Sequence, residues 1–180
     1  MKIKIKPSFW LVLCLIFYFN LQFPAIALVS SLLHEAGHLT AILLNEGEIK
    51  YLQLSAFGAM FDANLSKLSR GSKIAVYLSG PLVSILAALL CFYFSGRSFL
   101  VLVFSAGVIN LVLGIINLLP MRPLDGGNAL WVLAANSRYF KIWEIGFRIL
   151  FAAVFLWAAV CLKSVFVLLF LFYILFVWRI

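Results

Sequence analysis

A short polar motif, His34-Glu35-Ala36-Gly37-His38, lies inside an apolar segment that covers residues 7–45. A transmembrane helix needs about 20 apolar residues, so this segment is too long to cross a bilayer only once. The polar residues just before Pro24 are a natural place for a turn between two helices. The segment therefore predicts two spans, at residues 8–20 and 24–44, and the only two histidines of the chain lie in the second span.

The composition extends this prediction to the whole chain. Hydrophobic residues make up 66% of the 180 positions and the mean hydropathy is +1.15, whereas a soluble domain is about half apolar. We therefore predict an all-α polytopic membrane protein with one domain over residues 1–180 and about six transmembrane helices. The expected spans are residues 8–20, 24–44, 71–94, 99–119, 144–162 and 164–178.

The basic residues indicate how these spans are oriented. Lys and Arg number 14 against 6 acidic residues, which gives a net charge of +8. With six spans and Lys2 in the cytoplasm, every Lys and Arg except Arg97 and Lys163 falls on the cytoplasmic side, as the positive-inside rule requires. Both termini are then cytoplasmic. We interpret the charge as this topological signal and expect no nucleic-acid partner.

Between the second and third expected spans, residues 49–62 have a different pattern. β-branched and aromatic residues alternate with polar ones, and Gly58 interrupts the run. Alternation of this kind has the two-residue period of a strand. We expect a short membrane-associated β-hairpin at this point of the chain.

The motif at residues 34–38 has the spacing of a metal-binding helix. Residues four apart lie on the same face of a helix, so His34 and His38 can direct both imidazoles at one ion while Glu35 lies beside them. This arrangement suits zinc with a water molecule and an adjacent base. An alternative is a pair of buried histidines that form hydrogen bonds across helices, next to a glutamate on an ion pathway.

Asp125 is the candidate third ligand, because a catalytic zinc keeps three protein ligands and one open position. It lies within residues 117–127, where two prolines and two glycines interrupt the fourth span. Irregular backbone at membrane depth is tolerated where protein or water surrounds it. An alternative role for Asp125 is to cap the following helix, residues 126–135. The acidic residues other than Asp125 and Glu35 lie in loops or at span edges: Glu46, Glu48, Asp62 and Glu144.

Together, the HEAGH motif on an early span and the sequence NLLPMRPLDGG after a later one resemble the site-2 protease family of intramembrane zinc metalloproteases, of the M50 type. The resemblance covers nearly the whole chain. It implies that His34, His38 and Asp125 hold one Zn²⁺ ion and that Glu35 is the catalytic base. It also implies that Asn117, at the asparagine position of the second motif, holds substrate or stabilises the oxyanion.

Residues 54–59, LSAFGA, narrow the resemblance. They are similar to the PFGG strand of the group that contains stage IV sporulation protein FB, with Ala59 in place of the second glycine. The resemblance implies that Phe57 and Gly58 bind substrate, because an extended segment at residues 53–61 can pair with an unwound chain. We expect no CBS domain of the kind that many members of this group carry.

Residues 80–84, GPLVS, are similar to the GPxxN motif of the family, with Ser84 in place of asparagine. We expect Gly80 and Pro81 to serve helix packing and kinking. We expect the exchange at Ser84 to leave the metal site unaffected.

The resemblance implies hydrolysis of peptide bonds in membrane-associated or transmembrane protein substrates, with a pro-sigma or anti-sigma factor as a candidate. It also implies a bacterial cell membrane, an active-site opening on the cytoplasmic side, and regulatory partners in the lipid bilayer. Two rival functions are open. A metal or proton transporter would need more intramembrane ionisable residues than Glu35 and Asp125. A non-catalytic membrane chaperone would have lost a metal ligand or the base, and all four residues are present.

Overall fold

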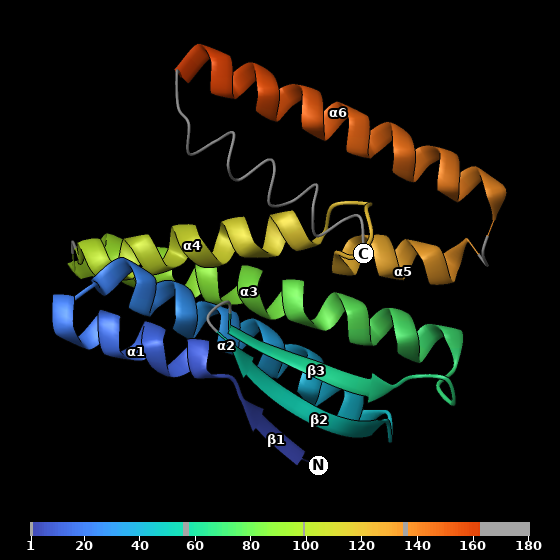
Figure 1. The fold of residues 1–180 in the computed structure, drawn as a ribbon, viewed down its shortest axis with the longest axis horizontal. Helices are drawn as coiled ribbons and strands as arrows, with labels where there is room; N and C mark the ends of the chain where they lie inside the picture. Colours follow the sequence, from blue (N-terminus) through green and yellow to red (C-terminus); the bar gives the residue numbers. More distant parts are fainter. Residues whose placement is uncertain (1, 56–57, 99, 135–136, 163–180) are drawn as a thin grey trace. The chain divides into compact units, whose positions relative to one another are not determined.

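The computed structural model of the chain describes residues 2–55, 58–98, 100–134 and 137–162, and these are mostly helical (Figure 1). The chain divides into two compact units, Met1–Leu118 and Leu119–Ile180. The predicted sixth span, residues 164–178, lies outside the described residues.

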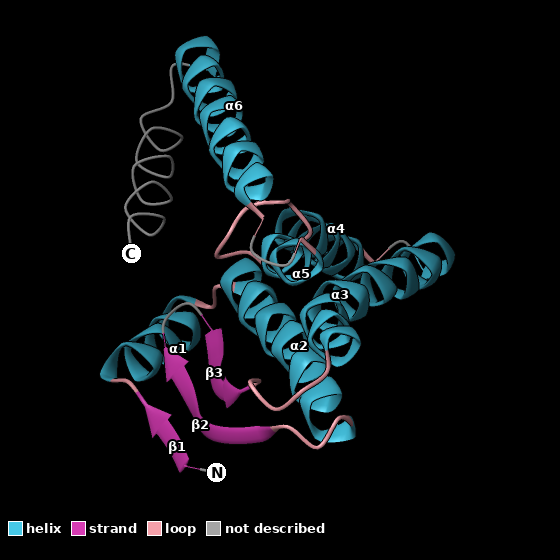
Figure 2. Ribbon diagram, turned by 90° about the vertical axis from the view of Figure 1, so that its right-hand side faces the viewer, coloured by secondary structure: helices cyan, strands magenta, loops and turns pink. Residues whose placement is uncertain are grey.

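Four helices form most of the first unit: α1 (Pro7–Phe19), α2 (Gln22–Leu44), α3 (Arg70–Ser98) and α4 (Val101–Asn117). Helices α2, α3 and α4 pack against one another (Figure 2). Small residues make this close packing possible, as they do in many membrane helix bundles. A Cβ atom added at Gly114 of α4, for example, would lie 2.9 Å from Ile85 of α3.

Three strands accompany these helices: β1 (Lys2–Ile5), β2 (Glu48–Ser55) and β3 (Gly58–Asn64). The order in the sheet is β1-β2-β3, with β1 parallel to β2 and β2 antiparallel to β3. Figure 2 shows the sheet beside α2, which contacts β3. The β2–β3 hairpin confirms the extended segment that the sequence predicts.

The strand β1 was not predicted from the sequence. Its pairing joins Lys2 to Tyr51 and Ile5 to Leu54, and therefore depends on residues far away in the chain. One prediction needs correction as a result. Residues 53–55 lie in the central strand, and Gln53 and Leu54 are paired on both sides, so only the β3 part of the predicted 53–61 edge is an outer strand.

The second unit contains α5 (Asp125–Leu133) and α6 (Arg138–Leu162). Helix α6 begins at Arg138, whereas the sequence predicts a span that begins at residue 144. The side chain of Glu144 is buried and paired with Arg122 and Arg148, so its charge does not prevent the apolar helix from extending toward Arg138.

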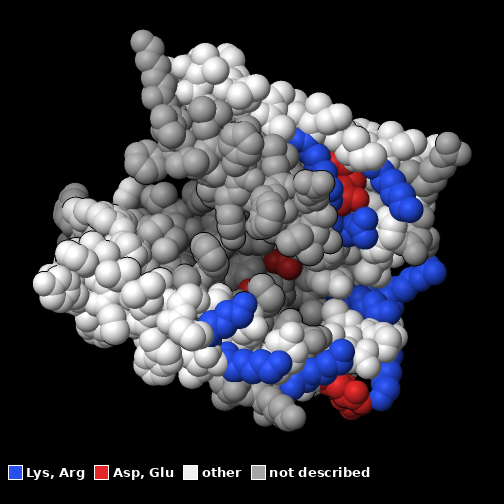
Figure 3. Space-filling view, viewed as in Figure 1, with Lys and Arg blue, Asp and Glu red and all other residues white. Residues whose placement is uncertain are grey.

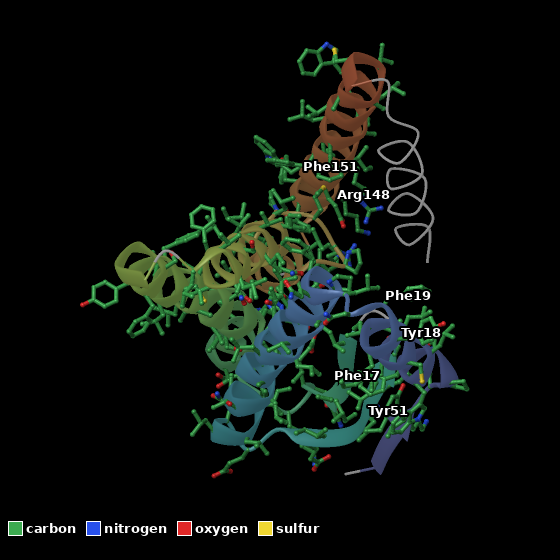
Figure 4. All side chains as sticks on the ribbon, turned by 90° about the vertical axis from the view of Figure 1, so that its left-hand side faces the viewer. Phe17, Tyr18, Phe19, Tyr51, Arg148 and Phe151 are labelled. Atoms are coloured by element: carbon green, nitrogen blue, oxygen red, sulfur yellow. The ribbon has the colours of Figure 1, made fainter. Side chains whose placement is uncertain are left out.

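Three of the described helices are long and apolar enough to cross a membrane, within Gln22–Leu44, Arg70–Gly96 and Tyr139–Cys161. Helices α1 and α4 are apolar but shorter, with 13 and 17 residues, or about 20 and 26 Å at 1.5 Å per residue. Large apolar side chains cover their surfaces, and Phe17 and Tyr18 at the end of α1 are 82% and 83% exposed (Figure 4). The chain is therefore a multi-pass membrane protein, although the described residues do not establish six spans.

Candidate metal centre

His34 and His38 lie one helical turn apart on α2, and both are buried, with 4% and 9% of their surfaces exposed. Their Nε2 atoms face each other at 3.2 Å. The two rings are arranged edge to face, with centroids 4.9 Å apart. The two imidazoles therefore direct their Nε2 atoms at one place, as the four-residue spacing predicts.

The opposite nitrogen of each ring is bonded to α3. His38 Nδ1 donates to the carbonyl oxygen of Val76 at 2.7 Å. A carbonyl only accepts, so this nitrogen carries the proton and a neutral His38 keeps a lone pair on Nε2. His34 Nδ1 lies 2.9 Å from the Oγ atom of Ser84, which can accept a hydrogen bond in the same way. Both Nε2 atoms can therefore act as metal ligands, as in other sites where a second partner fixes the histidine tautomer.

The distance between the two Nε2 atoms fits zinc. Tetrahedral zinc with Zn–N bonds of about 2.0–2.1 Å places two ligand nitrogens about 3.3 Å apart. The observed separation is 3.2 Å. When both rings carry their proton on Nδ1, the two Nε2 lone pairs face each other, and a cation between them removes their repulsion. The histidine pair therefore has the donor atoms and the spacing of two ligands of one ion.

Glycine lets α3 approach the histidines closely. A Cβ atom added at Gly80 would lie 2.2 Å from His38 Nε2, and one at Gly37 would lie 2.8 Å from the Ser79 carbonyl oxygen. Gly80 thus does more than serve packing between the helices, because its missing side chain leaves the space that His38 occupies.

Ser84 corrects another expectation. From the sequence we expect that Ser84, which stands where the family motif has asparagine, leaves the metal site unaffected. In the structure Ser84 is completely buried, and its hydroxyl group contacts the His34 ring. The prediction was wrong because a motif on one helix does not reveal which side chain of another helix it faces.

The other predicted site residues of the first unit lie on different elements: Glu35 on α2, Asn117 on α4 and Gly58 on β3. Glu35 follows His34 on α2 and is half-buried. Asn117 is the last residue of α4, and its Nδ2 atom donates to the Leu113 carbonyl oxygen at 2.9 Å. Gly58 begins β3 opposite Ser55. Phe57 lies outside the described residues.

Asp125 belongs to the second unit, where it is the first residue of α5. The N-cap position is Leu124, which provides no side-chain cap, so Asp125 does not occupy the capping position that the alternative role requires. A carboxylate in the first turn is favoured by the partial positive charge of the helix N-terminus. Asp125 is half-buried.

The segment before α5 is closely packed within the second unit. Met121 is completely buried, the Leu124 N–H donates to the Met121 carbonyl oxygen at 2.9 Å, and the Arg122-Pro123 peptide bond is cis. A Cβ atom added at Gly127 would lie 2.2 Å from the Met121 carbonyl carbon. The first turn of α5 therefore packs directly on the backbone of this segment.

Two charged side chains of helix α6 contact the same segment. Glu144, which the sequence places at a span edge, is 4% exposed and accepts hydrogen bonds from Arg122 and Arg148. Figure 4 labels Arg148 on α6. We call Arg122, Glu144 and Arg148 the ionic cluster. Its signal in the sequence was an acidic residue four positions before an arginine, within a segment that is otherwise apolar.

The chain resembles known proteins in sequence and in fold. The model of Peptidase family M50 matches residues 96–157. A putative zinc metalloprotease of Synechocystis is 31% identical over 116 residues, which cover 58% of this chain and 30% of that protein. A zinc metalloprotease of Methanocaldococcus jannaschii is 27% identical over 147 residues, which cover 78% of this chain and 40% of that protein. The chain thus spans less than half the length of both curated relatives.

The fold is also similar to that of a solved structure. The site-2 protease from Methanocaldococcus jannaschii matches with a TM-score of 0.69 and 21% sequence identity. The match covers 98% of this chain and 88% of that chain. The two chains therefore share a fold over almost their whole length.

Proposed function

We infer that this chain belongs to the site-2 protease family, of the M50 type, and that it is an intramembrane zinc metalloprotease. We propose that it hydrolyses peptide bonds of membrane-embedded protein substrates. The observation that carries the proposal is the buried pair of Nε2 atoms, 3.2 Å apart on a helix long enough to cross a membrane.

His34, His38 and Asp125 are the proposed zinc ligands. The histidines supply two neutral nitrogen donors, and Asp125 supplies the oxygen donor that the family motif requires at its position. When bound, zinc polarises the scissile carbonyl group and lowers the pKa of a water molecule towards about 7.

Glu35 is the proposed general base. It follows His34 directly on α2, so its carboxylate starts from the same helical turn as a proposed ligand. In this role Glu35 accepts a proton from the attacking water and later transfers it to the leaving amine. The hydrogen bond from His38 Nδ1 to the Val76 carbonyl oxygen leaves the lone pair of His38 Nε2 available to the metal.

Strand β3 and Asn117 are the proposed substrate contacts. A transmembrane substrate hides its carbonyl groups in helical hydrogen bonds, so it must unwind before attack. The outer edge of β3, which begins at Gly58, can stabilise the unwound chain by backbone pairing, and Phe57 precedes it. The amide of Asn117 has two hydrogens, and the bond to Leu113 uses one of them. The other can donate to substrate or to the oxyanion.

The sheet supports the proposed topology. Because β1 and β2 are hydrogen-bonded, Lys2–Ile5 and Glu48–Ser55 lie on the same side of the membrane. The chain between them must therefore cross an even number of times, and α1 must cross if α2 does. On the face shown in Figure 3, the Lys and Arg side chains of the first unit gather around this sheet, which favours the cytoplasm for that side.

The finer parts of the proposal rest on the sequence and, for the cytoplasmic side, on this orientation. They are six spans, cytoplasmic termini, an active site that opens to the cytoplasm, and a bacterial cell membrane. The motif at residues 54–59 favours the stage IV sporulation protein FB group, for which a pro-sigma or anti-sigma factor is the candidate substrate.

Replacement of Glu35 by glutamine tests the proposal. The amide cannot accept a proton from water, whereas both imidazoles stay in place, so Glu35→Gln should keep its zinc and lose cleavage. The test measures zinc content by elemental analysis and cleavage of a co-expressed transmembrane substrate in the same preparation. Wild-type turnover in the variant would reject the role of Glu35. Full activity after removal of all bound metal would reject the metalloprotease itself.

A further inference from the structure

We propose that Glu144 of α6 is a positioning residue for Asp125: its carboxylate holds the Arg122 peptide and thereby fixes the first turn of α5. This inference rests on the proposed role of Asp125 as a zinc ligand. It assigns a role to a carboxylate that the proposed chemistry does not otherwise use.

Side chains of α6 bind both backbone polar groups of Arg122. The Arg122 N–H donates to Glu144 Oε1 at 3.0 Å, and the Arg122 carbonyl oxygen accepts from Arg148 at 2.9 Å. Backbone groups of this kind are normally paired within a helix or a sheet. In this irregular segment, two charged side chains of α6 supply both partners.

The Arg122 side chain is held as well. Its Nε and terminal nitrogen donate to the two carboxylate oxygens of Glu144 at 3.3 and 3.2 Å, which is a two-point contact. Its guanidinium group also lies 4.0 Å from the centre of the Trp131 ring of α5. Arg122 is thus fixed on one side by α6 and on the other by α5.

A short path leads from Arg122 to Asp125. Gly127 packs against the Met121–Arg122 peptide so closely that an added Cβ atom would lie 2.5 Å from the Arg122 nitrogen. The side chain of Asn128 donates to the Pro123 carbonyl oxygen at 3.0 Å. The first turn of α5 therefore cannot rotate without moving Arg122, and Glu144 opposes that movement.

The burial of the cluster makes it sensitive to charge. The side chain of Glu144 is 6% exposed, whereas those of Arg122 and Arg148 are 35% and 32% exposed. Removal of one partner from a buried ion pair leaves the other charges uncompensated. Loss of the Glu144 charge should therefore let the Arg122 segment move, and the first turn of α5, which carries Asp125, should move with it.

The experiment measures zinc affinity in the full chain, purified in detergent, by competition with a chromophoric chelator. We expect Glu144→Gln to weaken zinc binding by about 10- to 100-fold, as replacement of a group that orients a metal ligand does. Glu144→Asp, which keeps the charge, should recover part of the loss. Glu48→Gln makes the same chemical change at the exposed Glu48–Lys67 pair and should leave zinc affinity unchanged.

Cobalt substitution separates positioning from general stability. The visible absorption spectrum of bound Co²⁺ reports ligand geometry, so Glu144→Gln should change this spectrum and Glu48→Gln should not. If Glu144→Gln does not fold, Glu144→Asp serves instead, because the shorter side chain keeps the charge but withdraws the carboxylate from the Arg122 peptide. An unchanged spectrum and zinc affinity in the variant tested would overturn the proposal.

A double variant distinguishes this inference from the proposed function. If Glu144 acts through Asp125, the pair Asp125→Ala and Glu144→Gln should bind zinc no more weakly than Asp125→Ala alone. Additive losses would overturn the positioning role and leave the ligand role intact. Wild-type zinc affinity in Asp125→Ala would instead reject Asp125 as a ligand.

Discussion

In the first unit, His34 and His38 are held at close range by neutral groups, whereas in the second unit charges hold the segment before Asp125. The histidine rings are bonded to a serine hydroxyl and a backbone carbonyl, and Gly80 leaves space for one of them. The Arg122 segment is bonded to the ionic cluster. The two kinds of support should fail for different reasons, one when volume is added and the other when charge is removed.

This difference has a physical reason. Neutral imidazoles are needed as nitrogen donors, and a nearby charge would alter their protonation. The Arg122 segment is irregular backbone, and its polar groups need partners that a regular helix would have provided. Charged side chains supply those partners at the cost of burying ions, which pairing offsets.

The largest effect should follow from removal of a proposed ligand. His38→Ala and Asp125→Ala each delete one of three protein donors, so each should weaken zinc binding by more than the roughly 100-fold expected from a supporting residue. Elemental analysis and chelator competition measure this effect, and cleavage should be lost in parallel. Full zinc occupancy in Asp125→Ala would mean that only the histidine region binds metal.

Added volume should break the histidine region next. Gly80→Ala places a methyl group where His38 Nε2 lies, at a separation of 2.2 Å, so the ring or α3 must move. Overpacking of this kind costs about 1–3 kcal/mol. We expect zinc affinity to fall by about 10-fold or more. Gly96→Ala is the matched control on the same helix, since an added Cβ atom there meets nothing within 4 Å. Equal effects of the two variants would contradict the close approach.

Loss of a hydrogen bond should have a smaller effect on the same region. Ser84→Ala removes the oxygen beside His34 Nδ1 and leaves a buried polar group without that partner, which costs about 1–3 kcal/mol. We expect roughly 10-fold weaker zinc binding with a folded protein. The control is Ser95→Ala, also on α3, whose hydroxyl group donates only to the Phe92 carbonyl oxygen among the bonds described. Unchanged zinc affinity in Ser84→Ala would show that Ser84 does not fix the tautomer of His34.

The smallest effect should come from the exposed ion pair, in contrast to the ionic cluster. Lys67 donates to Glu48 at 2.6 Å, and this hydrogen bond, together with the lysine charge, lowers the pKa of Glu48 below its usual 4.5. A lowered pKa means that the pair stabilises the fold above the ordinary pKa and ceases to do so as the pH falls. Both side chains are largely exposed, so Glu48→Gln should change the thermal midpoint very little at neutral pH. A large shift would contradict this assignment.

Local patterns in the sequence predicted much of this arrangement. The four-residue spacing of His34 and His38 determines that they share a helix face. The alternation in residues 49–62 has the period of a strand, and the hairpin is present. The prolines and glycines around Asp125 indicate the break between α4 and α5. Each of these features depends on residues close together in the chain.

What the sequence did not predict depends on contacts between distant segments. Ser84 faces His34 across fifty positions, and nothing in the motif around Ser84 names its partner. The sequence places Glu144 at the end of a span, and only the structure shows that it is bonded to Arg122. Strand β1 has only four residues, and its partner lies beyond two helices.

The parallel pairing of β1 with β2 has a consequence for the order of assembly. Strand β1 is made first, but its partner is made only after α1 and α2. The sheet therefore cannot close until both helices have been synthesised, and pairing across such a separation is slow compared with local contacts. If α1 entered the membrane in the wrong direction, Lys2–Ile5 would lie on the side opposite β2 and the strand could not pair. If both helices cross the membrane as proposed, the closed sheet therefore requires that they return the chain to the side on which β1 lies.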